Sequence, residues 1–384
     1  MELTAYMGFV CYNSYLEIDL GILRENFRSI RETLPEGTEM IPVLKGDAYG
    51  FGAVEVAKIL CAEGGVNTIA LAQVGEAAEL RSAGFGCELL VIGAIPLEHI
   101  PVAVENGLAL TVFSPDAARS LDAEAGKQGK IINVHIKIET GLNRIGVRPG
   151  RPLDELLTVL KTAENLKVCG VFTHFSDGEV FGSKEAKAQF ARFMTAAEQV
   201  RAAGFTNAKR HVCNSGASDW FTEAYLDAVR IGRRLYMGSR DHPLPVGAPG
   251  AVGEVASWRT SIMNLHTVQP GDTVGYDGMF TAMRPTDVAT VCVGYGDGLC
   301  SDFVRAGSPV LVNGKRARYI GVCMDQCLLD VTGIDCAIGD EVTIFGRASD
   351  GSFLSAQELA ATVSHEGVFF TDLLSKRVER RYIG

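Results

Sequence analysis

The most informative run in this chain reads Val43-Leu44-Lys45-Gly46-Asp47-Ala48-Tyr49-Gly50-Phe51-Gly52. Residues 41–44 predict a short apolar strand, and helical spacing resumes at residues 54–60. Lys45 therefore falls at the carboxyl end of a strand, which is where α/β barrels carry their chemistry. A lysine ammonium that is partly removed from water loses basicity and can form a Schiff base with an aldehyde cofactor. Taken alone, the run also fits a surface lysine beside a tight turn.

Outside this run, composition limits the class of protein. The chain has 384 residues and is 47% hydrophobic, which predicts two globular domains. A net charge of -10 argues against a nucleic-acid or anionic-membrane partner. No stretch is long enough to span a bilayer, although residues 1–12 leave open a longer, membrane-tethered protein. The ten cysteines form no CxxC pair, which indicates a reducing cytoplasm and no structural metal.

Short apolar runs alternate with helical runs through most of the chain, as in repeated βα units. Helices are predicted at residues 55–63, 153–163 and 184–203. About eight units predict a (β/α)₈ barrel, a TIM-like fold, over residues 14–245, with a doubly wound open sheet as the alternative. The predicted strands share β-branched or bulky apolar residues and are residues 15–18, 39–44, 68–73, 88–93, 108–113, 131–138, 168–174 and 209–213.

The pattern changes after the barrel. Residues 241–253 are rich in proline and glycine and break the periodicity, which indicates a linker. We expect a smaller, mostly β domain over residues 246–384. Its predicted strands are residues 257–267, 288–293, 308–312, 317–323 and 341–345.

Several segments resemble, in order, those of the alanine racemase family of pyridoxal-phosphate enzymes, and the likeness covers nearly the whole chain. The resemblance implies the cofactor pyridoxal 5'-phosphate, interconversion of L- and D-alanine, and D-alanine biosynthesis for the cell wall. Besides the lysine run, the segments are residues 134–147, Thr173-His174-Phe175, His211-Val212-Cys213-Asn214-Ser215, Val229-Arg230-Ile231-Gly232, Val274-Gly275-Tyr276, residues 294–298 and Cys323-Met324-Asp325-Gln326.

Racemisation needs an acid or base on each face of the α-carbon, because a single base mostly returns the proton to the face it came from. The resemblance assigns one face to Lys45 and the other to Tyr276. Tyrosine is a weak base at neutral pH, so His174 and Arg230 would lower its pKa as a hydrogen-bonded relay. The alternative for Tyr276 is a buried tyrosine of the β domain.

The resemblance also implies the cofactor contacts. Arg230 would face the pyridine nitrogen, and a guanidinium cannot accept that nitrogen's proton. The ring would then stay unprotonated, which limits transamination. An ordinary salt-bridged arginine is the alternative. The remaining expected cofactor contacts are Lys45, Tyr49, Ser215, Gly232 and the backbone amide of Arg233, with His211 orienting Arg230.

Other residues are expected at the substrate. Arg144 would bind its carboxylate through a planar fork. Lys137 resembles a lysine that is often carbamylated in the family, with an unmodified buried lysine as the alternative. Met324 and Asp325 resemble residues that reach, as Tyr276 does, into a second copy, so a homodimer with composite active sites is implied. Simple core packing is their alternative.

The chain departs from the family pattern near its end. His365 stands where the family has a tyrosine that narrows the substrate pocket, so a serine racemase or a dual alanine and serine racemase is the alternative function. A decarboxylase on the same fold would use a carboxylate at the pyridine nitrogen, which Arg230 contradicts. A noncatalytic pyridoxal-phosphate carrier would lack the β domain that supplies Tyr276.

Overall fold

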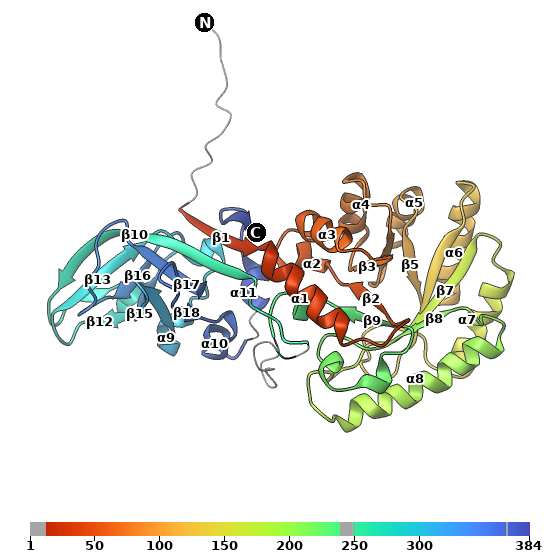
Figure 1. Cartoon of the computed structure of the whole chain (residues 1–384). Coiled ribbons are helices and arrows are strands. Elements are labelled where there is room, and N and C mark those ends of the chain that lie inside the picture. Colours follow the sequence, from red (N-terminus) through yellow and green to blue (C-terminus); the bar gives the residue numbers. More distant parts are fainter. Residues whose placement is uncertain (1–12, 239–247, 249, 366–367) are drawn as a thin grey trace, which may run out of the picture. The chain divides into compact units, whose positions relative to one another are not determined.

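The computed structural model describes residues 13–238, 248, 250–365 and 368–384. The described residues form two compact units, one within Leu23–Gly253 and the other within Glu254–Gly384 together with residues 13–22 (Figure 1). The expected domain boundary at residues 245 and 246, and much of the expected linker, lie outside the described residues.

The first unit is built on eight parallel strands. β3 to β8 pair in sequence order, and β2 pairs with β9. Backbone hydrogen bonds join the two sets, from Leu44 N to Ala70 O and from Arg230 N to Cys213 O, each 2.9 Å, so the ring closes. The strands are β2 (Glu39–Pro42), β3 (Thr68–Leu71), β4 (Glu88–Val91), β5 (Ala109–Val112), β6 (Ile132–Lys137), β7 (Leu166–Phe172), β8 (Lys209–His211) and β9 (Ala228–Ile231).

Helices separate the strands along the chain and lie outside them (Figure 1). Their apolar faces turn inward, as in α7, where Leu153, Leu156, Leu157 and Leu160 are buried. Ser183 begins the longest of these helices by accepting a hydrogen bond from Ala186 N. The helices are α1 (Leu20–Glu32), α3 (Ala53–Ala62), α4 (Val74–Ser82), α5 (Ile100–Glu105), α6 (Pro115–Lys127), α7 (Arg151–Thr162) and α8 (Lys184–Ala202), whereas α2 (Lys45–Tyr49) is a left-handed turn that follows β2.

The second unit is mostly β, as expected. Nine strands form one sheet in the order β18-β17-β14-β15-β16-β13-β10-β1-β19, and β10 also pairs with β17, so the sheet curls back on itself. Trp258, Tyr319 and Phe345 are buried in this unit. The strands are β1 (Ser14–Asp19), β10 (Ala256–Val268), β13 (Thr286–Val291), β14 (Pro309–Val312), β15 (Lys315–Val322), β16 (Cys327–Asp330), β17 (Glu341–Arg347), β18 (Phe353–Leu354) and β19 (Glu379–Ile383).

Smaller elements complete this unit. β11 (Thr273–Val274) and β12 (Phe280–Thr281) form a separate two-stranded sheet. Short helices are α9 (Phe303–Ala306), α10 (Ala356–Ala361) and α11 (Val368–Leu373).

The barrel is confirmed, but one of its predicted strands is wrong. Residues 15–18 were expected to open the barrel, whereas β1 pairs antiparallel with β10 and parallel with β19 in the second unit. The eighth barrel strand is instead β9, which was not predicted. The burial pattern gives the reason, because β1 alternates buried and half-buried residues, whereas all four residues of β9 are buried. Alternation is typical of an antiparallel sheet with one covered face, and continuous burial is typical of a parallel barrel.

Candidate active site

A cavity of about 140 Å³ opens at the carboxyl ends of the barrel strands. It gathers seven of the residues that the sequence singled out, which lie in β9 and in the segments that follow β2, β7, β8 and β9. Sequence reasoning missed Asn214, although it lies within a recognised segment, and Glu179, for which no sequence signal exists. The lining residues are Val43, Lys45, Tyr49, Ile92, His174, Glu179, Asn214, Ser215, Arg230, Gly232 and Arg233.

The backbone that follows Lys45 forms a left-handed turn. Gly46, Asp47, Ala48 and Tyr49 have φ of 63°, 52°, 56° and 59°. Left-handed backbone costs a non-glycine residue about 1–2 kcal/mol, so surrounding bonds must hold the turn. Asp47 Oδ1 accepts from Ala53 N at 2.7 Å, and Glu76 Oε1 accepts from Gly46 N at 2.7 Å. The turn lines the cavity with both Lys45 and Tyr49, and Lys45 Nζ lies 5.7 Å from the centroid of the Tyr49 ring.

Tyr49, Ser215 and Gly232 form a small polar cradle in this cavity. A Cβ on Gly232 would lie 2.3 Å from Tyr49 Oη, so only glycine fits here. Gly232 N donates to Ser215 Oγ at 3.0 Å, which leaves the Ser215 hydroxyl hydrogen available for another acceptor. Hydroxyl groups such as those of Tyr49 and Ser215 can donate hydrogen bonds to phosphate oxygens. The donor set therefore fits the phosphate of pyridoxal 5'-phosphate, with the Lys45 amine in the same cavity.

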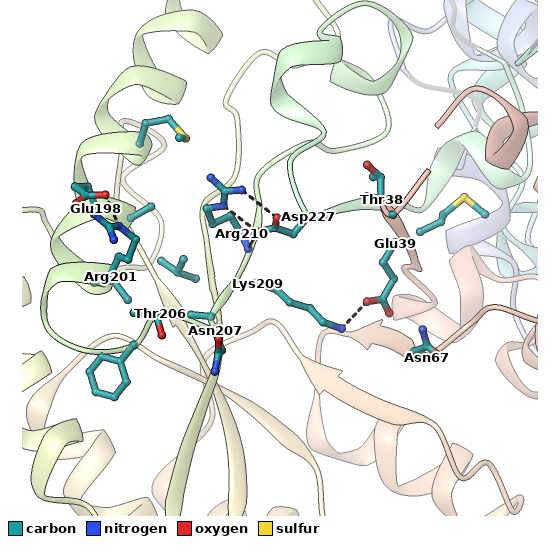
Figure 2. A pocket seen from close by; sticks show the side chains of 18 of the residues that line it. Thr38, Glu39, Asn67, Glu198, Arg201, Thr206, Asn207, Lys209, Arg210 and Asp227 are labelled. Carbon is teal, nitrogen blue, oxygen red and sulfur yellow. Dashed lines mark hydrogen bonds and ion pairs between the residues drawn. The ribbon is translucent and has the colours of Figure 1, made fainter. Parts of the chain in front are cut away.

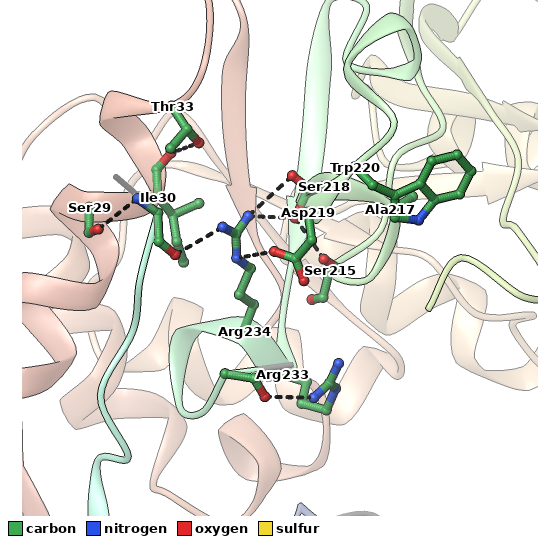
Figure 3. A network of polar contacts seen from close by, with 12 residues as sticks. Ser29, Ile30, Thr33, Ser215, Ala217, Ser218, Asp219, Trp220, Arg233 and Arg234 are labelled. Carbon is green, nitrogen blue, oxygen red and sulfur yellow. Dashed lines mark hydrogen bonds and ion pairs between the residues drawn. The ribbon is translucent and has the colours of Figure 1, made fainter. Parts of the chain in front are cut away.

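A buried ion pair lies beside the loop that carries Ser215 (Figure 3). Arg234 is 4% exposed, and its Nε lies 2.8 Å from Asp219 Oδ1. Arg234 Nη1 also donates to Ser218 Oγ at 2.9 Å, and Ser218 Oγ donates to Ser215 O at 2.6 Å. The loop that carries Ser215 is thus tied to the segment that carries Gly232. Neither Arg234 nor Asp219 was predicted, since an arginine next to Arg233 gives no sign of burial.

Arg230 is the buried cation of the site. It is 3% exposed, and its guanidinium donates to Thr173 O at 2.7 Å, to His211 O at 2.5 Å and to His211 Nδ1 at 3.0 Å. A longer contact of 3.4 Å reaches His174 Nδ1. Burial lowers the pKa of Arg230 to about 10, so the group stays charged at neutral pH.

Two titratable neighbours of Arg230 have strongly shifted pKa values. Burial, followed by the charges of Arg230 and Lys137, lowers the pKa of His174 well below its usual 6.5, so the imidazole is neutral at pH 7. Lys137 is 3% exposed, and burial together with Arg230 and Arg144 lowers its pKa to about 7. Arg144 itself is exposed in the loop between β6 and α7, close enough for its charge to act on all three groups.

The remaining predicted residues belong to the second unit. Tyr276 and Met324 are 64% and 58% exposed, and Asp325 is exposed, so core packing does not account for them. Their segments lie by the end of β15, where a Cβ on Gly275 would lie 3.5 Å from Gly321 Cα. His365 is also exposed in this unit, with its amide donating to Ala360 O.

A larger cavity, of about 850 Å³, lies at the opposite mouth of the barrel (Figure 2). Several of its charged side chains form ion pairs, including Lys209 with Glu39 at 2.6 Å and Arg210 with Asp227 at 2.9 Å. It contains neither Lys45 nor Arg230, and it opens at the amino ends of β2 and β8, whereas barrel enzymes react at the carboxyl ends. The smaller cavity is therefore the candidate active site.

The fold and the site together define an enzyme with a (β/α)₈ barrel, an appended β domain and a lysine-centred site at the carboxyl ends of the strands. Within the described residues, no helix has the length and apolar character that crossing a bilayer requires. Family models match in two consecutive parts, the alanine racemase N-terminal domain at residues 18–240 and the alanine racemase C-terminal domain at residues 255–382. The chain belongs to the alanine racemase family.

Individual relatives span nearly the whole chain. Alanine racemase of Desulfovibrio desulfuricans is 35% identical over 376 residues, covering 96% of this chain and 98% of the relative. Alanine racemase of Methanococcus maripaludis is 33% identical and covers 97% and 100%. Among solved structures, alanine racemase of Clostridium difficile superposes with a TM-score of 0.89 at 29% identity, covering 97% of this chain and 96% of that one. The Bacillus anthracis enzyme, solved with bound L-Ala-P, also has a TM-score of 0.89, at 30% identity and 98% and 96% coverage.

Proposed function

We propose that this enzyme interconverts L- and D-alanine with pyridoxal 5'-phosphate as its cofactor. The observation that carries the proposal is one cavity that holds the Lys45 amine, the cradle of Tyr49, Ser215 and Gly232, and the buried Arg230. When bound, the cofactor supplies an electron sink that makes the α-proton of an amino acid removable. Lys45 would hold the cofactor between turnovers.

Two groups would move the proton. Lys45 Nζ acts on one face of the α-carbon, and Tyr276 Oη of a second copy acts on the other. The exposure of Tyr276, Met324 and Asp325 supports a homodimer in which each copy completes the other's site. The neutral His174 beside Arg230 gives the Tyr276 hydroxyl a proton relay of low basicity.

Arg230 would direct the chemistry toward racemisation. It would face the pyridine nitrogen with a group that only donates hydrogen bonds, so the nitrogen would keep its lone pair. Protonation of that nitrogen favours side reactions such as transamination. Since a decarboxylase on this fold would need a carboxylate there, the buried Arg230 disfavours that function.

Arg144 would bind the substrate carboxylate, with Lys137 behind it. The pKa of Lys137, about 7, leaves much of this amine neutral at physiological pH. A neutral amine attacks carbon dioxide through its lone pair and loses a proton, which gives a carbamate. The resulting negative charge would lie among Arg144 and Arg230, whose charges now act on Lys137.

Alanine is the substrate that we propose, because the reported relatives are named alanine racemases. Serine becomes the preferred substrate only if the exposed His365 widens the pocket. We place the activity in the cytoplasm, where it would supply D-alanine for the cell wall. The described cysteines are free thiols, which is in keeping with a reducing compartment.

The test is direct. Purified protein with pyridoxal 5'-phosphate is incubated separately with L-alanine and L-serine, and the D-enantiomers are followed by chiral chromatography. D-alanine should form faster. Borohydride reduction followed by peptide mapping should find the cofactor on Lys45. If the cofactor is bound at Lys45 but neither amino acid is racemised, the protein would be a noncatalytic pyridoxal-phosphate carrier.

Variants separate the two proton-transfer groups. Tyr276→Phe should retain the cofactor on Lys45 but lose about 10²- to 10⁴-fold in kcat, the usual contribution of a general acid or base. The matched control is Tyr15→Phe, which removes one hydroxyl from β1 of the same unit. Equal activity of the two variants would exclude Tyr276 as a base.

A further inference from the structure

A file of polar side chains continues from Arg230 through the interior of the barrel. Arg230 Nη1 lies 3.0 Å from His211 Nδ1, and His211 Nε2 lies 2.9 Å from His135 Nδ1. On its other side, His135 Nε2 lies 3.6 Å from Glu88 Oε1. The four residues come from β9, β8, β6 and β4, and His211 and His135 are 0% and 2% exposed. We call them the polar file.

The packing around the polar file fixes its geometry. A Cβ on Gly170 would lie 2.2 Å from His135 Nδ1, so glycine is required on β7 beside this imidazole. Phe172 stacks on His211 with ring centroids 4.8 Å apart and planes inclined by 7°. Asn133 Nδ2 donates to Glu88 Oε2 at 2.7 Å. Each ring is thereby held in one orientation.

The hydrogen-bond donors and acceptors of the polar file determine which ring nitrogen of each histidine carries the hydrogen. Because a guanidinium only donates, His211 Nδ1 must accept, and the proton of neutral His211 lies on Nε2. That N–H donates to His135 Nδ1 at 2.9 Å, so the hydrogen of the His135 ring lies on Nε2. It points toward Glu88, whose Oε1 lies 3.6 Å away, beyond hydrogen-bond distance, so Glu88 favours this hydrogen through its charge. Although burial raises the pKa of Glu88, contacts with His135 and Asn133 and the charge of Lys209 lower it to about 2, so the carboxylate is ionised at neutral pH.

We propose that Glu88 and His135 are positioning residues that hold Arg230 in place by fixing the tautomer of His211. This inference rests on the proposed function in one respect, the placement of Arg230 against the pyridine nitrogen. If the proton of His135 moved to Nδ1, it would face the N–H of His211. His211 would then have to move its own proton to Nδ1, where it would face a hydrogen of Arg230 at 3.0 Å. Arg230 would have to shift, and its hold on the ring nitrogen would be lost.

Asn133 makes the proposal unusually testable. In Glu88→Gln, the Asn133 N–H keeps the amide oxygen of the new side chain on its own side. The amide NH₂ is then left facing His135 and repels a hydrogen on Nε2, which favours the His135 tautomer with its hydrogen on Nδ1. In the double variant Glu88→Gln with Asn133→Asp, the new carboxylate accepts from that NH₂. The amide oxygen then faces His135, and the original tautomer returns.

The first measurement needs neither activity nor cofactor. Nitrogen-15 NMR of protein labelled at its seven histidines reports the tautomer of each ring. The expected result is Nε2–H on both His135 and His211 in the wild type, loss of that pattern in Glu88→Gln and its return in the double variant. An Nδ1–H tautomer of His211 in the wild type overturns the proposal, as does an unchanged pattern in Glu88→Gln.

The second measurement uses the enzyme with its cofactor. Glu88→Gln should lower kcat by about 10-fold, a usual effect of outer-shell partners, and should raise the formation of the pyridoxamine form severalfold. The double variant should restore both, and Thr111→Val, which removes a buried hydroxyl of β5 outside the polar file, should change neither. Unchanged kcat and side reaction in Glu88→Gln overturn the inference. If the wild type racemises no amino acid, the proposed function is wrong. The histidine tautomers then still test the proposal for the polar file.

Discussion

Lys137 gives the most quantitative test of the site, because a buried lysine must affect stability. It is 3% exposed, with Nζ 4.5 Å from the centroid of the Phe172 ring. Burial, and after it the charges of Arg230 and Arg144, lower its pKa from 10.5 to about 7. At about 1.4 kcal/mol per pH unit, this fall corresponds to roughly 5 kcal/mol that the folded state loses when the amine is charged.

The free energy of unfolding depends on pH because the folded and unfolded states bind the Lys137 proton differently. Between pH 7 and pH 10.5 the unfolded chain binds the Lys137 proton and the folded protein does not, so the free energy of unfolding rises with pH in that window. The penalty is fully present below pH 7 and disappears above pH 10.5. Between pH 7 and pH 9, Lys137 alone should raise the free energy of unfolding by about 2 kcal/mol.

The assay is urea unfolding of the cofactor-free protein at pH 7 and at pH 9, in buffer free of carbon dioxide. Lys137→Met removes the charge with little change in length, so the wild type should gain about 2 kcal/mol more than this variant between the two pH values. Lys167→Met, at an exposed position of β7, is the control and should behave as the wild type. Added bicarbonate at pH 7 should stabilise the wild type and leave Lys137→Met unchanged.

Two results would refute this reasoning. Equal pH dependence in the wild type and Lys137→Met would mean that Lys137 keeps an ordinary pKa in the folded protein. A bicarbonate effect of the same size in both proteins would mean that no carbamate forms at Lys137. Carbon-13 NMR after equilibration with labelled bicarbonate distinguishes the modified from the unmodified lysine.

Three further changes test the cavity and its support. Gly232→Ala should weaken cofactor binding about 10-fold in a fluorescence titration, because the added methyl group would lie 2.3 Å from Tyr49 Oη; undiminished affinity would argue against the cradle. Asp219→Ala should lower the free energy of unfolding by about 3–5 kcal/mol in urea, because it leaves the charge of Arg234 buried without its carboxylate; the double variant with Arg234→Met should recover part of the loss. His365→Tyr should shift the ratio of kcat/KM for alanine and serine by about 10-fold, within the 1–3 kcal/mol that such pocket changes typically give; a constant ratio would remove His365 from substrate selection.

Much of the barrel was predictable because its strands and helices differ in period. Seven of the eight strands lie where short apolar runs predicted them. The eighth was assigned to residues 15–18, although their alternation of polar and apolar side chains is typical of a half-covered antiparallel strand. The true eighth strand is Ala228–Ile231, where the charged Arg230 interrupts the short apolar run that would have predicted a buried strand.

The site was predictable in identity but not in geometry. The order and spacing of the segments identified Lys45, Arg230 and Gly232. They do not give the distances between these residues in the folded protein. The left-handed turn after Lys45 was beyond sequence reasoning, because Asp47 and Ala48 adopt positive φ only when tertiary bonds compel them.

The buried charge of Arg230 explains why the interior of this barrel is polar. Among the described residues, its hydrogen-bond partners are carbonyl oxygens and histidine nitrogens, and it forms no ion pair with a carboxylate. Strand-end carbonyls such as Thr173 O are fixed in space by the barrel itself, so they hold the planar fork without neutralising it. A carboxylate in direct contact would neutralise that charge and could take a proton where the ring nitrogen must not receive one. Glu88 carries its negative charge at the far end of two imidazoles, where it orients Arg230 and stays away from the reaction.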